Sequence, residues 1–258
     1  RILTARYSTG AGQCPDRAMR CPLALTPIQG RFILEAAAMG GAVGAIPAGG
    51  GKTLPSLLIP EVCGAETPVL VVPAALRDKT RIEWAHYAKH WRVHSSIHII
   101  AFEQISRVGY NDWLDTVRPD CIIIDEAHRA KNPKAACTRK IHAYIEACRK
   151  AGRKLVVVVM SGTLSRTGMR DHATLQRLAL GAGAPVPHRS DTITAWNQIL
   201  GEGDEADNLY LEAGVRADWS RPDLLGPERE HVAWAGSRAS LRVGFRARML
   251  ETPGVVGS

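Results

Sequence analysis

The chain has 258 residues, a length that predicts one large domain, or one domain with an appendage, at roughly 100 to 200 residues per domain. A hydrophobic share of 45% and a charged share of 22% are those of a globular protein and exclude a mostly disordered chain. The excess of 33 Lys and Arg over 25 Asp and Glu gives a net charge of +8, which suits either a polyanionic partner or an ordinary basic surface.

The sequence contains no predicted membrane span, and its first residues do not resemble a signal peptide. The longest uncharged stretch, residues 36–51, is shorter than the roughly 20 residues that a membrane span needs, and glycines and Pro47 interrupt it. The chain begins at Arg1 without the apolar core of a signal peptide, so we expect a piece of a longer cytoplasmic protein, with the nucleus as the alternative. The six cysteines form no CxxC pair, which predicts reduced, mostly buried thiols; a zinc site at Cys14 and Cys21 is the alternative.

Apolar runs alternate with helix-like segments along the first two thirds of the chain. The runs of strand length are residues 42–46, 68–72, 97–101, 121–124 and 155–160. The segments typical of helices are residues 27–39, 53–59, 75–91 and 133–151. Continuous apolar runs are typical of strands that are covered on both faces. The pattern therefore predicts an α/β fold with a doubly wound, mostly parallel sheet and helices on both faces, in which ligands bind at the carboxyl ends of the strands.

The last part of the chain, residues 181–258, has a different pattern. It contains five prolines, an acidic patch at residues 202–207 and no long apolar run. We expect a loop-rich extension that is partly helical near residues 192–200 and 237–250.

The first chemical motif reads IPAGGGKT, from Ile46 to Thr53, and it lies between a predicted strand and a predicted helix. Glycines let successive amide groups point at a phosphate, and the helix N-terminus adds partial positive charge. The motif therefore predicts ATP binding by Gly49, Gly50, Gly51, Lys52 and Thr53. Lys52 is expected on the β- and γ-phosphates, and the Thr53 hydroxyl on Mg²⁺. The position of Ile46 is usually held by glycine or alanine.

The second motif follows the strand predicted at residues 121–124. Asp125 and Glu126 are expected to act as a Mg²⁺ ligand and as the carboxylate that polarises the attacking water, respectively. Such a pair alone also suits a solvated turn, an interpretation that the upstream phosphate loop disfavours. His128 is expected to contact a neighbouring polar segment.

The string DEAHRAKN at residues 125–132 resembles the hydrolysis motif of superfamily 2 helicases and translocases, in particular the Swi/Snf-type and related phage helicases. The resemblance implies a RecA-like lobe in which Lys52, Asp125 and Glu126 are catalytic. The string LTPIQ at residues 25–29 looks like the segment whose glutamine reads the adenine edge, a role that falls to Gln29.

Three more segments match in order. The strings LVVP at residues 70–73 and IAFEQI at residues 100–105 resemble motifs that touch nucleic acid, which implies this role for Pro73, Phe102 and Gln104. The string MSGTL at residues 160–164 resembles the coupling motif, which implies that Ser161 and Thr163 act with His128. Leu164 departs from the proline common in the Swi/Snf-type motif.

The resemblance covers about residues 23–170. It implies an N-terminal extension at residues 1–22, a RecA-like ATP-binding lobe at residues 23–180, and a connector at residues 181–258 toward a second lobe that supplies arginines. The predicted function is ATP hydrolysis coupled to movement on nucleic acid, with DNA favoured over RNA. Two alternatives are a nucleotide-gated binding module without productive turnover and, less favoured, a P-loop phosphotransferase.

Two weaker patterns remain. The segment 129–154 carries nine Lys and Arg against Glu146 alone, which suits phosphate binding and a solvated helix face equally. Trp84 and Trp91 lie two turns apart on a predicted helix, which favours core packing over base stacking.

Overall fold

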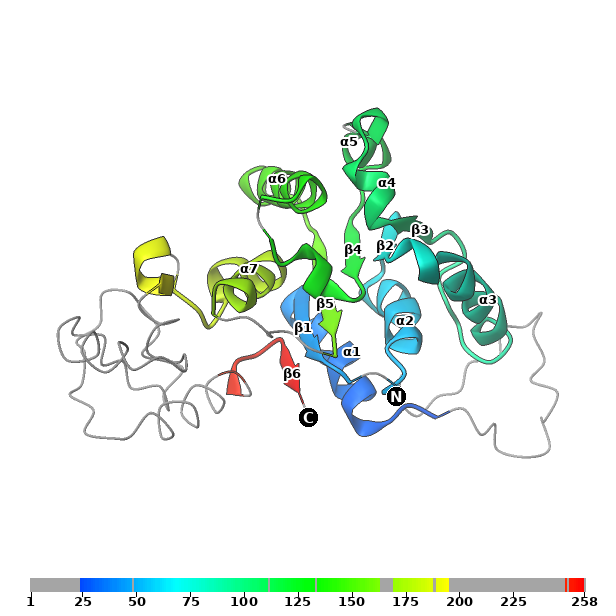
Figure 1. Cartoon of the computed structure of the whole chain (residues 1–258). Helices are drawn as coiled ribbons and strands as arrows, with labels where there is room; N and C mark the ends of the chain where they lie inside the picture. The colour runs from blue at the N-terminus through cyan, green and yellow to red at the C-terminus, as the bar shows by residue number, and fades with distance from the viewer. Residues whose placement is uncertain are drawn as a thin grey trace.

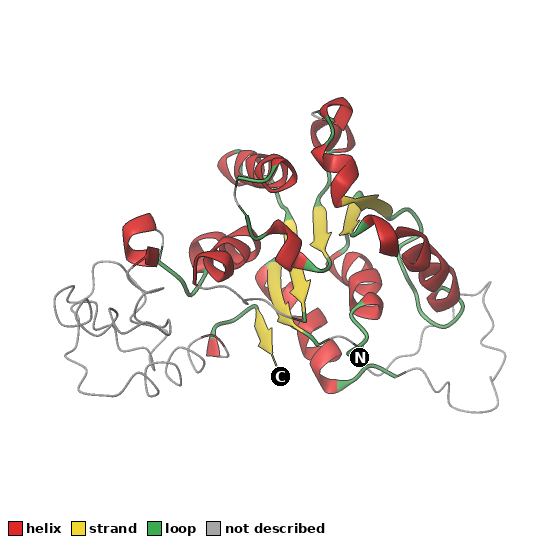
Figure 2. Cartoon of the chain, viewed as in Figure 1, coloured by secondary structure: helices red, strands yellow, loops and turns green. Residues whose placement is uncertain are grey.

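The computed structural model describes residues 24–47, 49–110, 112–132, 134–162, 169–187, 189–194, 249 and 251–257. Its strands form one sheet, with helices packed on both faces (Figure 1). The strands are β1 (Gly41–Ala45), β2 (Pro68–Val72), β3 (His98–Ala101), β4 (Cys121–Ile124), β5 (Val156–Ser161) and β6 (Val255–Gly257). Figure 2 shows the strands together at the centre of the molecule.

The sheet has the order β3-β2-β4-β5-β1-β6, and all five strand pairs are parallel. Strand β5 lies between β4 and β1, so the segments that follow these three strands meet at the carboxyl ends of the strands. The predicted doubly wound α/β fold is confirmed.

The helices are α1 (Pro27–Met39), α2 (Thr53–Cys63), α3 (Arg77–Tyr87), α4 (Phe102–Ser106), α5 (Trp113–Val117), α6 (Ala136–Lys150) and α7 (Met169–Leu180). Short 3-10 turns lie at η1 (Ala74–Leu76), η2 (Val108–Tyr110), η3 (Ala127–Ala130) and η4 (Gly181–Gly183). The predicted helix at residues 75–91 is therefore shorter, because η1 precedes it and α3 ends at Tyr87. Helices α4, α5 and α7 were not predicted.

Two apolar layers enclose the sheet. On one face Val71, Ile122 and Val159 pack with residues of α4, α6 and α7. On the other face Leu70, Ile123 and Val158 pack with residues of α1 and α2. Successive strand residues point to opposite faces, so both faces of each inner strand are buried and the strands read as continuous apolar runs.

Local chemistry sets the ends of α1. Thr26 Oγ1 accepts a hydrogen bond from the Gln29 N–H (3.4 Å), and Gln29 Oε1 accepts one from the Thr26 N–H (2.9 Å). This capping box precedes Pro27, whose missing N–H costs little in the first turn. The helix ends at Gly40, which has a φ of 67°.

The C-terminal residues add an edge strand to the sheet. Strand β6, which falls within the segment predicted as a connector, pairs with β1. The Gly254 N–H donates to Glu35 Oε2 (2.8 Å) and the Gly254 carbonyl accepts from the Val43 N–H (2.7 Å), so this segment is tied to both α1 and β1. Residues 190–194 and 249 are helical, and they adjoin or fall within the helical segments predicted near residues 192–200 and 237–250. Residues 195–248 and the predicted extension 1–22 lie outside the described residues.

Cys63, Cys121, Cys137 and Cys148 are free thiols; Cys63 is half-buried and the other three are buried, as predicted for the described cysteines. Cys14 and Cys21 lie outside the described residues. Among the described helices, none has the length and apolar character needed to cross a membrane.

Candidate nucleotide-binding site

The glycine-rich loop connects β1 to the N-terminus of α2. Gly49 and Gly51 have φ values of 80° and 71°, a region that favours glycine. A Cβ on Gly50 would lie 2.8 Å from Cγ2 of Ile46, which is fully buried beneath the loop. The loop thus needs all three glycines for its close turn, and its position at a helix N-terminus suits a phosphate group.

Gln29, on α1, is hydrogen-bonded to this loop. Its Nε2 donates to the carbonyls of Gly50 (3.2 Å) and Gly51 (3.0 Å), while its Oε1 accepts from Thr26. A Cβ on Gly51 would lie 2.5 Å from the same Nε2. Gln29 is buried, and both of its polar atoms are engaged within the protein. The expected contact of Gln29 with adenine stays a prediction, whereas its contact with the glycine-rich loop is present in the structure.

The Lys52 ammonium lies beside the acidic segment that follows β4. Its Nζ is 3.2 Å from Glu126 Oε1 and 3.5 Å from the Ile46 carbonyl oxygen. The Lys52 side chain is only 9% exposed and that of Glu126 is 26% exposed. The structure therefore brings together the predicted phosphate-binding lysine and the predicted catalytic carboxylate, which are 74 positions apart in the sequence.

Asp125 follows β4 directly, and it is partly buried, as Glu126 is. Its N–H continues the ladder by donating to the Val71 carbonyl (2.9 Å), and its Oδ1 accepts from the Glu126 N–H (2.8 Å). The pKa of Asp125 is raised to about 6, chiefly by burial and in part by the adjacent Glu126 carboxylate, whereas the Glu126 N–H and the Lys52 ammonium oppose the rise. A cation placed beside this carboxylate would offset the cost of burying its charge.

Glu126 has a φ of 49°, an uncommon value for a residue other than glycine. Strain of this kind costs on the order of 1–3 kcal/mol and persists where the surroundings hold it in place. In this protein Glu126 is held by the Lys52 ion pair and by the turn η3 that follows.

The donor set fits Mg²⁺ bound together with a nucleotide. Mg²⁺ commonly takes one or two carboxylates plus phosphate oxygens and water, rather than an all-protein cage. The Asp125 carboxylate and the Thr53 hydroxyl, if both bound the ion as predicted, would supply such a partial set. No group of three or more His, Cys, Asp or Glu side chains suited to a metal ion is found among the described residues.

His128 links the acidic segment to the end of β5. Its Nδ1 lies 3.2 Å from Ser161 Oγ and 3.3 Å from Glu126 Oε2. Ser161 is fully buried. The predicted pairing of His128 with the coupling segment is therefore present for Ser161, whereas Thr163 lies outside the described residues.

The residues expected to touch nucleic acid follow β2 and β3. Pro73 precedes η1, and the Gln104 Oε1 accepts from Arg77 Nη1 (3.3 Å) and from the Ala101 N–H (3.0 Å). The Phe102 ring is 5% exposed and packs in the core, so its side chain offers almost no surface to a ligand. Because the side chain is buried, Phe102 can contact nucleic acid as predicted only through its main chain.

Glu103 and Arg129 are two residues of this region whose roles were not predicted. Glu103 Oε1 accepts from Arg129 Nη2 (2.8 Å) and its Oε2 accepts from the Ala74 N–H (3.2 Å), which ties together the segments after β2, β3 and β4. The Arg129 guanidinium also lies 5.6 Å from the centre of the Phe102 ring. The available signal was a pair of opposite charges in the segments that follow two parallel strands of the sheet, β3 and β4.

Several members of the basic run at residues 129–154 have structural partners. Lys140 Nζ donates to the carbonyls of Ile105 and Arg107 (both 2.7 Å), and the Arg149 guanidinium donates to the carbonyls of Arg177 (3.2 Å) and Leu178 (2.8 Å) at the end of α7. These contacts stabilise the fold whether or not the run also binds phosphates.

Comparison with models of known protein families gave no match, and comparison with curated proteins gave none either. Among solved structures, the chain is similar to the "Sulfolobus solfataricus SWI2/SNF2 ATPase core in complex with dsDNA", with 18% sequence identity and a TM-score of 0.47. The match covers 62% of this chain and 36% of that one, so this chain spans about a third of the length of that structure.

Proposed function

We propose that this chain is the ATP-binding lobe of a nucleic-acid-dependent ATPase of the helicase or translocase type. The observation that carries the proposal is the convergence of the glycine-rich loop, Lys52, Asp125 and Glu126 at the carboxyl ends of the strands. Lys52 Nζ lies 3.2 Å from Glu126 Oε1. Phosphoryl transfer to water requires positioning and charge neutralisation, and these residues are of the right kind for both.

Each residue has a distinct task in this proposal. The main-chain N–H groups of Gly49 to Gly51 and the N-terminus of α2 bind the phosphates, and Lys52 moves from Glu126 to the β- and γ-phosphates. Glu126, once released, orients the attacking water and accepts its proton. Asp125 and Thr53 would hold Mg²⁺, which when bound neutralises charge on the phosphate oxygens.

Two contacts support coupling between hydrolysis and movement. His128 contacts both Glu126 and Ser161, so a change at the γ-phosphate reaches the end of β5 through a single side chain. Glu103 ties the segments near Pro73 and Gln104, proposed to contact nucleic acid, to Arg129 in the same turn as His128. We place DNA ahead of RNA as the polymer, a second RecA-like lobe as the source of the missing arginines, and the cytoplasm as the location.

A second candidate is a nucleotide-gated binding module that does not turn over. The Lys52–Glu126 ion pair favours this second candidate. Hydrolysis requires Lys52 to bind the phosphates and Glu126 to bind a water, and the ion pair holds both groups away from those positions. In such a module ATP would displace Lys52 while Glu126 never reached a water.

Steady-state ATP hydrolysis by the full-length protein, with and without single- and double-stranded DNA, separates the two candidates. If the chain belongs to an ATPase, we expect hydrolysis that DNA stimulates at least several-fold. Binding of ATP with no hydrolysis above background under any of these conditions would favour the module.

A further inference from the structure

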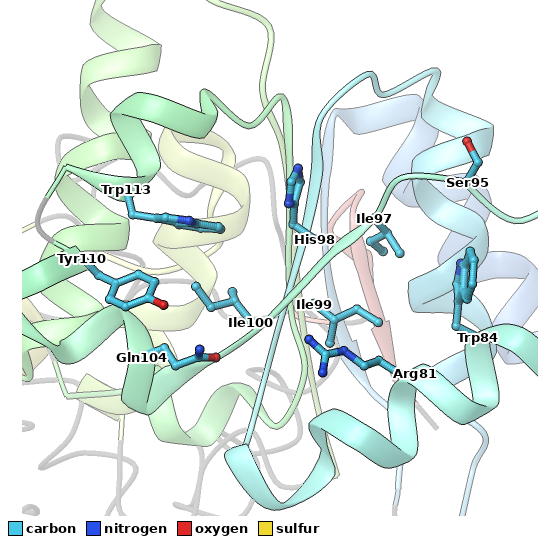
Figure 3. A pocket seen from close by; sticks show the side chains of 10 residues that line it. All are labelled: Arg81, Trp84, Ser95, Ile97, His98, Ile99, Ile100, Gln104, Tyr110 and Trp113. Atoms are coloured by element: carbon cyan, nitrogen blue, oxygen red, sulfur yellow. The ribbon is translucent and has the colours of Figure 1, made fainter.

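A groove of about 420 Å³ lies along β3, at the edge of the sheet, where β2 is the strand's one partner among the described strands. Helix α3 forms one wall, and α4, η2 and α5 form the other (Figure 3). We call this the β3 groove, and it is lined by Arg81, Trp84, Ser95, Ile97, His98, Ile99, Ile100, Gln104, Tyr110 and Trp113. Its volume is within the range of about 300–1,000 Å³ typical of small-ligand sites.

Aromatic side chains gather in this groove although the whole chain contains few of them. Phe, Trp and Tyr make up 5% of the sequence, yet Trp84 stands on one wall and Tyr110 and Trp113 on the other. The Trp113 ring centre lies 6.3 Å from that of His98 and 6.4 Å from that of Tyr110. Trp84 Nε1 donates to the His94 carbonyl (3.1 Å), which fixes its ring. Held aromatic rings of this kind are platforms on which nucleic-acid bases stack.

The polar groups of the groove suit a nucleotide. None of the ten lining residues is acidic, whereas Arg81 is cationic. Arg81 pairs with Asp78 at 3.2 Å, but both side chains are more than half exposed, so a phosphate can compete for the guanidinium. The described hydrogen bonds of Gln104 use its Oε1, which leaves its amide N–H groups as donors to a base edge.

An added peptide strand is the less favoured occupant. Alternate residues of a parallel edge strand direct their main-chain groups away from the sheet, and the Ala101 N–H belongs to this outward set because it donates to Gln104 Oε1. Strand β3 has only four residues, so one occupied donor removes a large part of the ladder that a peptide would need.

The groove is continuous with the segments proposed to contact nucleic acid. Gln104 lies at the carboxyl end of β3 and lines the groove, and it also accepts a hydrogen bond from Arg77 at the start of α3. A polynucleotide backbone that runs past Pro73 and Gln104 therefore passes the mouth of the groove.

We propose that the β3 groove binds an unpaired base of single-stranded nucleic acid, with Trp113 and Tyr110 as the stacking surface and Arg81 near the phosphate. This inference rests on the proposed function, because it assumes a nucleic-acid partner. It adds that the protein prefers a single strand that carries bases to a bare sugar-phosphate backbone.

The test measures binding of three fluorescein-labelled 12-mers to the full-length protein: oligothymidylate, a chain of the same length made of abasic sites, and a duplex. We expect oligothymidylate to bind about tenfold more tightly than the abasic chain. Trp113→Leu and Tyr110→Leu should each remove most of that preference. Ser95→Trp, which adds a side chain at an exposed position of the lining, should do the same by filling the groove without removing a packed residue.

Tyr87→Leu is the matched control, because Tyr87 is a half-buried tyrosine on α3 that does not line the groove, and it should keep the preference. Equal binding of oligothymidylate and the abasic chain by the wild type would overturn the inference. So would an unchanged preference in the three groove variants, which would leave the groove to a polypeptide. If none of the three polymers bound, the nucleic-acid part of the proposed function would fail as well.

Discussion

Gly51 is the residue whose replacement best tests the geometry of the glycine-rich loop. Its φ of 71° disfavours any side chain, and a Cβ would also approach Gln29 Nε2 to 2.5 Å, which would displace the amide that holds the loop. We therefore expect Gly51→Ala to weaken ATP binding at least tenfold and to lower the free energy of unfolding by about 2 kcal/mol. Isothermal titration and urea denaturation measure the two effects.

Gly64→Ala is the matched control for that substitution. Gly64 has a similar φ of 63° at the end of α2, but a Cβ there meets nothing within 4 Å. This variant should lose only the conformational term, about 1 kcal/mol, and bind ATP as the wild type does. Equal ATP affinities for wild type and Gly51→Ala would contradict the described loop geometry.

At the scale of elements, the attachment of β6 depends on Glu35. Its carboxylate on α1 accepts the Gly254 N–H at 2.8 Å, next to the point where β6 joins β1. Glu35→Ala should lower the free energy of unfolding by about 1–2 kcal/mol, because it removes a charge-assisted hydrogen bond from a mostly buried side chain.

The control for Glu35 is Arg31→Ala. Arg31 pairs with Glu35 at 3.8 Å and is more than half exposed, so its loss should cost less than about 0.5 kcal/mol. Chemical denaturation of both variants checks the difference. If Glu35→Ala were as stable as Arg31→Ala, the hydrogen bond to Gly254 would not hold β6 in place.

The sequence predicted the elements that have a strong local signal. Long apolar runs located β1 to β5, and Thr26, Pro27 and Gly40 account for the agreement between the predicted and observed α1. Strand β6 was missed because Val255 and Val256 are too short a run to distinguish from a loop, and its place is set by contacts with β1 more than 200 positions away. Helices α4 and α5 have five residues each, which is less than two turns and shows no period.

In the candidate site, too, contiguous motifs were predicted and contacts between distant segments were not. The residues of the glycine-rich loop and the acidic pair were predicted because each motif is contiguous. The Gln29 contact with the loop and the Glu103–Arg129 pair were not, because they join segments that are 22 and 26 positions apart and follow no periodic pattern.

At the scale of the whole molecule, His172 gives the stability a dependence on pH. Burial lowers the pKa of His172 to about 4, below its ordinary value near 6.5, while its Nε2 lies 3.2 Å from Gln176 Nε2 and 3.3 Å from Met249 Sδ. The unfolded chain thus takes up a proton at a higher pH than the folded protein does. We therefore expect the contribution of His172 to the free energy of unfolding to be full above pH 6.5 and to fall by about 2–3 kcal/mol as the pH drops toward 4.

Urea denaturation between pH 7 and pH 4 measures this loss, and His172→Gln isolates it from the contribution of carboxylates elsewhere. The variant should lose less stability than the wild type over this interval. Identical losses in the two proteins would show that His172 titrates normally in the folded state.

The central claim is that Lys52 and Glu126 form one hydrolytic site, and the most direct test measures ATP affinity and DNA-stimulated hydrolysis in the full-length protein with single substitutions. Lys52→Ala should weaken ATP binding at least tenfold, whereas Glu126→Gln should keep ATP affinity within about threefold and slow hydrolysis by about 10²–10⁴. Lys79→Ala, at a lysine that is 69% exposed on α3, should change neither quantity. Hydrolysis by Lys52→Ala and Glu126→Gln at the wild-type rate would contradict the claim.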